Sequence, residues 1–183
     1  MSHEILDAQI RSCTRCSELA ATRTTVVVGD IPAGARLVIV GEAPGAQEDR
    51  TGRPFVGRSG KLLDALLLEA GVERRHVAVL NTIKCRPPAN RVPTKQETAN
   101  CRQWTSAQLE LQVPRITVPL GLSATRWFLN TPTLSAVRGK VVEVDGRPVL
   151  PTYHPAAALR GGPDGEPMRL LRVDLRMAVE LAQ

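Results

Sequence analysis

Long apolar runs and aromatic side chains are scarce in this 183-residue chain, and each scarcity excludes something. No stretch approaches the roughly 18 consecutive apolar residues that a membrane-spanning helix requires. The first eleven residues carry charged side chains where a secretory signal needs an apolar core. We therefore expect a cytoplasmic protein with no membrane partner. The length and the 43% apolar content predict one globular domain over residues 1–183.

Negative charge is also in short supply, since 18 acidic residues face 24 basic ones and leave a net charge of +6. Only four of the basic residues are lysines. The planar guanidinium of arginine binds phosphate through paired hydrogen bonds, so this balance favours a polyanionic partner such as nucleic acid. Codon bias also produces chains rich in arginine and alanine, so the composition alone does not decide the matter.

Cysteines are few but informative, and they are Cys13, Cys16, Cys85 and Cys101. The first two form a C-x-x-C pair, and without a secretory signal four cysteines more often bind metal than form disulfides. Four unrelated buried thiols are the alternative. Four thiolates suit either zinc or an iron–sulfur cluster, and the spacing does not separate the two. We expect a structural site, because four protein ligands leave no position for a substrate.

Short apolar runs alternate with helical patterns along the chain. The predicted strands cover 36–41, 76–81 and 115–120, a hairpin is predicted from 140–144 and 149–152, and the predicted helices cover 3–11, 60–71, 94–112, 123–129 and 168–181. This order predicts a three-layer α/β/α sandwich around a central, mostly parallel four-stranded sheet. In such folds the ligand crevice lies beyond the carboxyl ends of the strands.

Turn and cap residues set the expected helix ends. Ser59 is expected to cap the helix at 60–71 and Gly71 to end it. Thr94 and Glu97 form a capping-box pattern at the start of the helix at 94–112. Pro155 is expected to open a further short helix.

Carboxylates and a lone aromatic ring follow the first predicted strand. Gly41 ends that strand, and the next residues present Glu42 and Glu48 in a loop whose glycines let the backbone approach a ligand. Phe55 lies in a second loop among arginines. Its ring either stacks on a ligand such as a nucleobase or folds back onto the core.

Two more polar residues fall at the ends of predicted strands. Asn81 ends the second strand, where its amide offers a donor and an acceptor or simply caps a turn. His154 follows the last strand, between a tyrosine and a proline. We expect no functional role for His3 or His76.

Several of these motifs, taken in order, resemble the uracil-DNA glycosylase superfamily and most closely its family 4, the iron–sulfur-containing uracil-DNA glycosylases. They are Gly41-Glu-Ala-Pro-Gly45 with Glu48-Asp49, Gly52-Arg-Pro-Phe-Val-Gly57, Asn81 ahead of Lys84-Cys85-Arg-Pro-Pro, Asn100-Cys101, and His154-Pro-Ala-Ala-Ala-Leu-Arg160. The resemblance runs from Cys13 to about Arg160 and includes all four cysteines. It implies a [4Fe-4S] cluster at Cys13, Cys16, Cys85 and Cys101.

The resemblance also implies roles around a uracil flipped out of DNA. Phe55 stacks on the base, Asn81 pairs with its O4 and N3 edge, and His154 donates toward O2 to stabilise the leaving uracil anion. Gly41 and Ala43 belong to the loop that lines the uracil pocket. Glu42, or alternatively Glu48, orients the attacking water.

Binding of the DNA itself is expected from a wedge and several phosphate contacts. The wedge is assigned to Leu159, where the family more often has two leucines, and the phosphate contacts are assigned to Arg58, Arg86, Arg91 and Arg160. The implied activity is hydrolysis of the N-glycosidic bond of uracil in single- or double-stranded DNA, by a nucleoid-associated monomer. The product is an abasic site.

A related branch of the superfamily bonds covalently to DNA through a histidine-bearing loop and has glutamine where Ala43 stands here. The stretch 86–102 contains no histidine, so we expect turnover rather than trapping. Two alternatives remain open. One is a DNA-binding iron–sulfur protein with weak catalysis, and the other is a glycosylase that prefers another deaminated base.

Overall fold

A computed structural model describes residues 2–183 and contains one five-stranded sheet with the strand order β2-β1-β3-β5-β4. The strands are β1 (Leu37–Gly41), β2 (Ala78–Asn81), β3 (Ile116–Pro119), β4 (Val142–Val144) and β5 (Arg147–Val149). All neighbours are parallel except β4 and β5. The predicted fold class is confirmed, but the count of four strands is wrong. Both arms of the predicted hairpin belong to this sheet, the first as β4 within 140–144 and the second as β5, which lies at Arg147–Val149 instead of 149–152.

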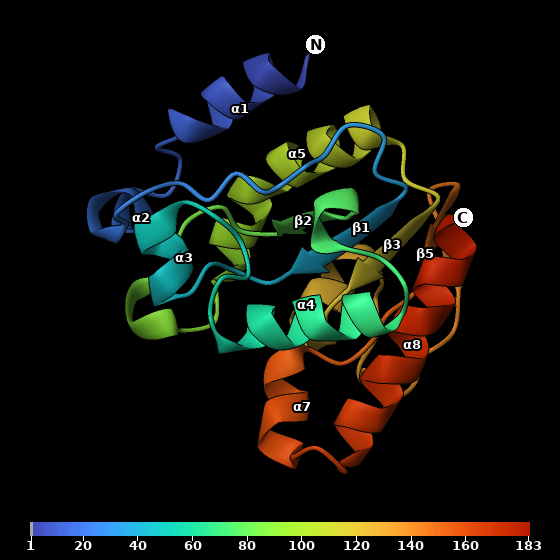
Figure 1. Cartoon of the computed structure of the whole chain (residues 1–183). Helices are drawn as coiled ribbons and strands as arrows, with labels where there is room; N and C mark the ends of the chain where they lie inside the picture. Colours follow the sequence, from blue (N-terminus) through green and yellow to red (C-terminus); the bar gives the residue numbers. More distant parts are fainter. Residues whose placement is uncertain (1) are drawn as a thin grey trace.

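Helices cover both faces of this sheet. They are α1 (His3–Arg11), α2 (Ser17–Thr22), α3 (Ala46–Thr51), α4 (Arg58–Glu69), α5 (Lys95–Gln112), α6 (Gly121–Phe128), α7 (Pro155–Gly161) and α8 (Glu166–Ala182), with short 3-10 turns η1 (Arg74–His76) and η2 (Pro88–Asn90). Figure 1 shows the chain as a whole. None of the helices within residues 2–183 combines the length and apolarity needed to cross a membrane.

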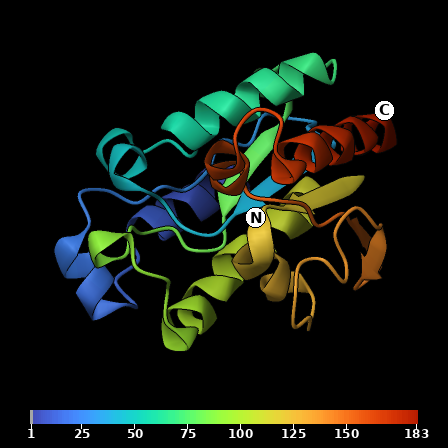
Figure 2. The same ribbon diagram turned by 90° about the horizontal axis from the view of Figure 1, so that it is seen from below.

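Strand β1 lies between β2 and β3, and all five of its residues are buried. Its side chains alternate between two cores. Leu37 and Ile39 belong to the core that α4 and α8 cover, whereas Val38 and Val40 belong to the core that α5 and α6 cover. Figure 2 shows the sheet between these two helical layers. Burial on both faces explains the continuous apolar run of this strand.

A third core attaches the N-terminal segment to the α5 side of the sandwich. Leu6 and Ile10 of α1 and Leu19 of α2 pack with Ile83 and with two of the cysteines. Figure 1 shows α1 next to α5. The cysteine-bearing segments are therefore joined by apolar packing as well.

Cap chemistry confirms one helix start and corrects another. Thr94 Oγ1 accepts the Glu97 N–H at 3.1 Å, and Glu97 Oε2 accepts the Thr94 N–H at 2.7 Å, which is the predicted capping box. Ser59 is not a cap, because α4 already begins at Arg58 with Gly57 as its N-cap. The Gly57 N–H donates instead to the carboxylate of Glu48 in α3.

Other predicted turn residues have the expected backbone conformation. Gly71 follows the C-cap of α4 with φ +95°, and Asp145 and Gly146 both have positive φ in the two-residue turn of the β4–β5 hairpin. The second strand begins at Ala78 rather than at His76, which belongs to η1. Helices α2 and α3 have six residues each, too few for an apolar periodicity that predicts them.

Candidate active site

Three segments deliver polar side chains to one cleft of about 920 Å³ at the carboxyl ends of the parallel strands. Glu42 directly follows β1, Asn81 ends β2, and His154 follows the Thr152 bridge to the end of β3. Gly41 and Asn81 are register partners across β1 and β2. Adjacent strand ends therefore bring together residues that are far apart in the sequence, as expected for this fold class.

Gly41 makes room for the two side chains above it. A methyl group added at Gly41 would lie 2.6 Å from Cζ of Phe55 and would also overlap the Asn81 amide. The Phe55 ring is 7% exposed and lines the cleft, and its centre lies 5.8 Å from that of the His154 ring. Phe55 has φ +53°, a left-handed conformation that is costly for a bulky residue. The ring thus belongs to the core and faces the cleft, so the two interpretations of Phe55 are compatible.

Asn81 is buried, and its backbone is held from below. Its carbonyl accepts hydrogen bonds from Lys84 Nζ at 2.8 Å and from Thr105 Oγ1 at 3.3 Å. Its side-chain amide forms no hydrogen bond with another residue in the range 2–183 and faces the cleft. Lys84 is fully buried, and this burial lowers its pKa to about 8. The backbone of Asn81 is therefore held, while the donor and the acceptor of its side-chain amide are available to a ligand.

His154 is the N-cap of α7, with Nδ1 accepting the N–H of Ala156 at 3.0 Å. Burial, together with the positive charge of Arg160, lowers the pKa of His154 to about 4. The ring is therefore neutral at pH 7. Because Nδ1 is an acceptor, the proton of the neutral ring is on Nε2. Gly121 has φ +83°, and a methyl group there would lie 3.1 Å from the His154 Cβ, so glycine lets the loop after β3 approach the histidine.

The two glutamates of the first loop differ in their surroundings. Glu48 accepts three backbone N–H groups, from Gly45 at 3.1 Å and from Val56 and Gly57 at 2.9 Å each. Its carboxylate therefore joins the loop after β1 to the start of α4. Glu42 Oε1 is buried without a hydrogen-bond partner in the described chain. Glu42 is the carboxylate that still has an oxygen free to bind something in the cleft.

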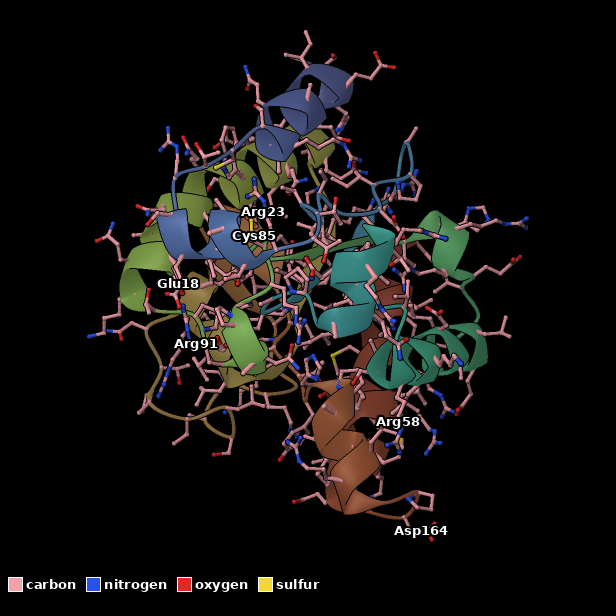
Figure 3. All side chains as sticks on the ribbon, turned by 90° about the vertical axis from the view of Figure 1, so that its left-hand side faces the viewer. Glu18, Arg23, Arg58, Cys85, Arg91 and Asp164 are labelled. Carbon is pink, nitrogen blue, oxygen red and sulfur yellow. The ribbon has the colours of Figure 1, made fainter. Side chains whose placement is uncertain are left out.

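The predicted phosphate-binding arginines fall into two groups. Arg58 and Arg160 line the cleft and make no hydrogen bond or ion pair within residues 2–183; Figure 3 shows Arg58 on the face that carries α4 and α7. Arg91 also lines the cleft, but its guanidinium is paired with Glu97 and Glu18.

Arg86 and the predicted wedge lie outside the lining of the cleft. The Arg86 Nε donates to Asn90 Oδ1 at 2.8 Å. Leu159 lies half-buried on α7, next to Arg160, which does line the cleft. Leu159 is therefore beside the opening rather than within it.

All four cysteines line a second, smaller pocket between α1, α2, α5 and the segment after β2. Each sulfur accepts a hydrogen bond, and the donors to Cys13, Cys16, Cys85 and Cys101 are Trp104 Nε1 at 3.3 Å, Asn100 Nδ2 at 3.5 Å, Arg23 Nη1 at 3.0 Å and the Lys84 N–H at 3.4 Å. Burial raises the pKa of the Cys85 thiol and raises that of Cys101 to about 11. Among residues 2–183 no three side chains of His, Cys, Asp or Glu are close enough to hold a single metal ion.

These donors suit sulfur ligands of a cluster. Hydrogen bonds to the ligand sulfurs are a regular feature of iron–sulfur sites, where they stabilise the negative charge of the thiolates. The guanidinium of Arg23 and the ammonium of Lys84 are cations near Cys85 and Cys101. The residues present therefore fit the cluster that the resemblance implies.

Sequence reasoning missed several residues of the cleft. Gly121, the first residue of α6, and Leu134, in the loop after α6, line it. The glycine at the end of the third predicted strand was a usable signal, because a strand-end glycine often permits close approach of backbone. Leu134 lies in a stretch without any pattern. Lys84 and Thr105 could not be found, because their contacts with the Asn81 carbonyl depend on the packing of α5 under β2.

Comparison with known proteins agrees with this geometry. The family model of the uracil DNA glycosylase superfamily matches residues 28–175. A type-4 uracil-DNA glycosylase of Thermotoga maritima is 43% identical over 178 residues, covering 96% of this chain and 92% of the relative. The corresponding values are 43%, 82% and 80% for a type-4 enzyme of Archaeoglobus fulgidus, and 40%, 86% and 76% for one of Sulfurisphaera tokodaii. The chain belongs to the uracil-DNA glycosylase superfamily and groups there with the type-4 uracil-DNA glycosylases.

Proposed function

We propose that this protein is a monofunctional uracil-DNA glycosylase, which removes uracil from DNA by hydrolysis and leaves an abasic site. The observation that carries the proposal is the gathering of Glu42, Phe55, Asn81 and His154 around one cleft at the strand ends. An aromatic face, an amide with free donor and acceptor, a neutral imidazole and an unpartnered carboxylate together match the needs of this reaction. The type-4 relatives support the same activity.

Asn81 provides the choice of base. Its amide can donate to O4 of uracil and accept from N3–H, whereas cytosine would present its exocyclic amine to the amide donor. A buried polar group left without its partner costs about 1 to 3 kcal/mol. The Phe55 ring offers a stacking surface for the flipped base, and Gly41 keeps the space between them open. Ala43, in the loop after β1, lines the same cleft.

His154 stabilises the leaving group. Cleavage of the N-glycosidic bond leaves negative charge on the base, and the Nε2–H of the neutral ring is available to donate toward O2 of the departing uracil. The helix cap at Nδ1 orients the ring before the substrate arrives. This arrangement lowers the barrier without requiring a proton to be transferred from the histidine.

Glu42 orients the water that attacks the sugar. Its unpartnered Oε1 can accept a hydrogen bond from that water, and its negative charge favours the cationic character of the sugar carbon in the transition state. Glu48 is a positioning residue, because both of its oxygens already bind backbone N–H groups. It holds the Glu42 loop against the loop that presents Phe55.

The substrate is DNA, and its backbone is bound by the free arginines of the cleft rim. Arg58 and Arg160, which line the cleft, contact phosphates near the flipped nucleotide in this proposal, and Arg86, outside the lining, contacts the backbone further away. Leu159, beside Arg160, serves as the wedge that fills the space left by the base. We further propose that residues 1–183 act as a single domain and a monomer on single- or double-stranded DNA, in the cytoplasm at the nucleoid.

Cys13, Cys16, Cys85 and Cys101 hold a [4Fe-4S] cluster in this proposal. The shared pocket and the hydrogen bond to every sulfur support it. When bound, the cluster supplies structural cross-linking of the N-terminal segment, the segment after β2 and α5. A brown protein with broad visible absorption and four irons per chain is expected, and a colourless protein with one zinc per chain would refute the assignment.

Uracil release is the test of the activity. The protein is incubated with single- and double-stranded oligonucleotides containing one uracil, and alkali then cleaves the strand at any abasic site. Asn81→Ala is the matched control, because the backbone of this residue remains held by Lys84 and Thr105. Cleavage that is lost in this variant supports the proposal. Binding without cleavage of either substrate would refute it, and faster release of hypoxanthine or xanthine would indicate another preferred base.

A further inference from the structure

Both terminal nitrogens of the Arg91 guanidinium are engaged within the protein. Its Nη1 and Nη2 donate to the two carboxylate oxygens of Glu97 at 2.9 and 2.7 Å, and Nη2 also donates to Glu18 Oε2 at 2.9 Å. Nη1 also donates to the Val92 carbonyl at 3.2 Å. The Arg91 side chain is 32% exposed and that of Glu97 9% exposed. Arg91 also lowers the pKa of Glu97 to about 2, so the pair stays charged at neutral pH. A phosphate would have to compete with two carboxylates for this guanidinium.

The partners of Arg91 lie next to the cysteines. Glu18 is two residues after Cys16, and Glu97 lies on α5 one helical turn before Cys101. Arg91 itself follows Cys85 on the same short segment. Figure 3 shows Glu18 beside Arg91, with Arg23 and Cys85 close to them on the same side of the molecule. One guanidinium thus joins the three chain segments that bear the four cysteines.

Arg91 also forms part of the cleft wall. Pro87, Asn90 and Arg91 line the cleft, whereas Glu97 lines the cysteine pocket. This wall contains two left-handed residues, Ala89 with φ +51° and Asn90 with φ +55°. Such conformations persist only when surrounding contacts hold them. The ion pairs of Arg91, at the end of this turn, hold the left-handed residues in place.

We infer that Arg91 is a positioning residue that couples the cysteine pocket to the DNA cleft, and not a phosphate contact. Arg91, Glu97 and Glu18 form what we call the Arg91 latch. The inference deepens the proposed function and rests on it for the identity of the cluster. The four cysteines would hold their chain segments together through the cluster. The ion pairs of the latch then fix residues 87–91 against those segments, and residues 87–91 border the DNA cleft. The latch in turn slows the loss of the cluster.

Glu18→Gln separates the latch from phosphate binding. Glu18 is 61% exposed and does not line the cleft, so glutamine removes the negative charge from one arm of the latch without touching the DNA site. If Arg91 bound phosphate, removing its competitor Glu18 would leave DNA affinity unchanged or raise it. If Arg91 is a latch, the variant loses the cluster to an iron chelator about 2- to 5-fold faster, the range expected for an exposed ion pair.

Arg91→Gln and Arg160→Gln complete the comparison. Loss of a phosphate contact flattens the dependence of log affinity on log salt by about 0.9. We expect this change for Arg160→Gln, whose guanidinium is free, and not for Arg91→Gln. Cluster loss should accelerate in Arg91→Gln and stay unchanged in Arg160→Gln. Because Glu18 and Arg91 act as one unit, the double variant Glu18→Gln/Arg91→Gln should be no worse than Arg91→Gln alone.

Hydrogen exchange provides a measurement that does not depend on the cluster. The amides of Asn90 and Arg91 are bonded to the carbonyls of Pro87 and Pro88, so opening of this turn exposes them. Faster exchange at these amides in Glu18→Gln supports the latch. Unchanged exchange in Glu18→Gln, or a flattened salt dependence in Arg91→Gln, would overturn it. A wild-type protein without a cluster, or without uracil release, would instead contradict the proposed function and leave the exchange result valid.

Discussion

The substitution His154→Asn separates the structural and chemical roles of this residue. Asparagine is a good N-cap, so its side-chain oxygen can still accept the Ala156 N–H that His154 Nδ1 accepts at 3.0 Å. The variant lacks both the titrating ring and the Nε2–H donor. We therefore expect a folded protein at pH 7 whose rate of uracil release is lower by about 100- to 1000-fold, as for loss of an oxyanion-stabilising donor.

The same variant should change the pH dependence of stability. The pKa of His154 falls from 6.5 in the unfolded chain to about 4 in the folded protein. Stability is therefore fully present above pH 6.5 and is lost as the pH falls through 4, because the unfolded chain binds a proton that the folded protein excludes. The full loss is about 3.4 kcal/mol at 1.36 kcal/mol per pKa unit, of which about 2.5 kcal/mol has occurred by pH 4.5.

Urea unfolding at pH 7 and at pH 4.5 measures this contribution. The carboxylates titrate in both proteins, so the comparison of wild type with His154→Asn isolates the histidine. The free energy of unfolding should fall between the two pH values by about 2 to 3 kcal/mol less in the variant than in the wild type. An equal fall in both proteins would show that the histidine is not kept neutral by burial. A rate within tenfold of wild type would contradict its role in leaving-group stabilisation.

Three further predictions concern glycine, strain and the cysteine pocket. Gly41→Ala should abolish most uracil release but leave the protein folded, because the added methyl would lie 2.6 Å from Cζ of Phe55. Oligonucleotide cleavage measures the activity and circular dichroism the fold. Near-normal cleavage would contradict the prediction. Val113 is β-branched, 76% exposed and held at φ +46°, so Val113→Gly should raise the free energy of unfolding by about 1 kcal/mol. Val92 is 72% exposed and has no positive φ, so Val92→Gly should not raise it. Urea unfolding compares the two variants. Cys85→Ser should lose iron and lower the melting temperature, whereas the rate of uracil release per folded molecule should change little. Retention of four irons per chain would contradict this prediction.

Much of the fold follows from local pattern. The run Leu37–Gly41 is apolar throughout because both faces of β1 are covered, and the Thr94 and Glu97 pair marks the start of α5 by its own chemistry. Local pattern is silent where an element is short. Helices α2 and α3 have six residues each, and α3 is held by the Glu48 carboxylate more than by apolar periodicity. Such elements depend on contacts that form only in the folded chain.

The candidate site also contains residues that the sequence could predict and residues that it could not. Residues placed by strand ends, such as Asn81 and His154, could be predicted to meet because parallel strands end at one edge. The internal ion pairs of Arg91 could not be seen in the sequence, since one of its partners, Glu18, lies 73 residues away. The positioning role of Glu48 could not be predicted either, because its three N–H partners come from two separate segments. The number of donors that a side chain has already satisfied is visible only in three dimensions.

The third core has a consequence for the order of folding during synthesis. Leu6, Ile10 and Leu19 are buried against Ile83 and the α5 side of the sandwich, so the first helices find their partners only after β2 and α5 have been made. A nine-residue helix such as α1 is marginal alone in water. Helices α1 and α2 are made before α5, so we expect them to fold only after α5 has been made and can receive them.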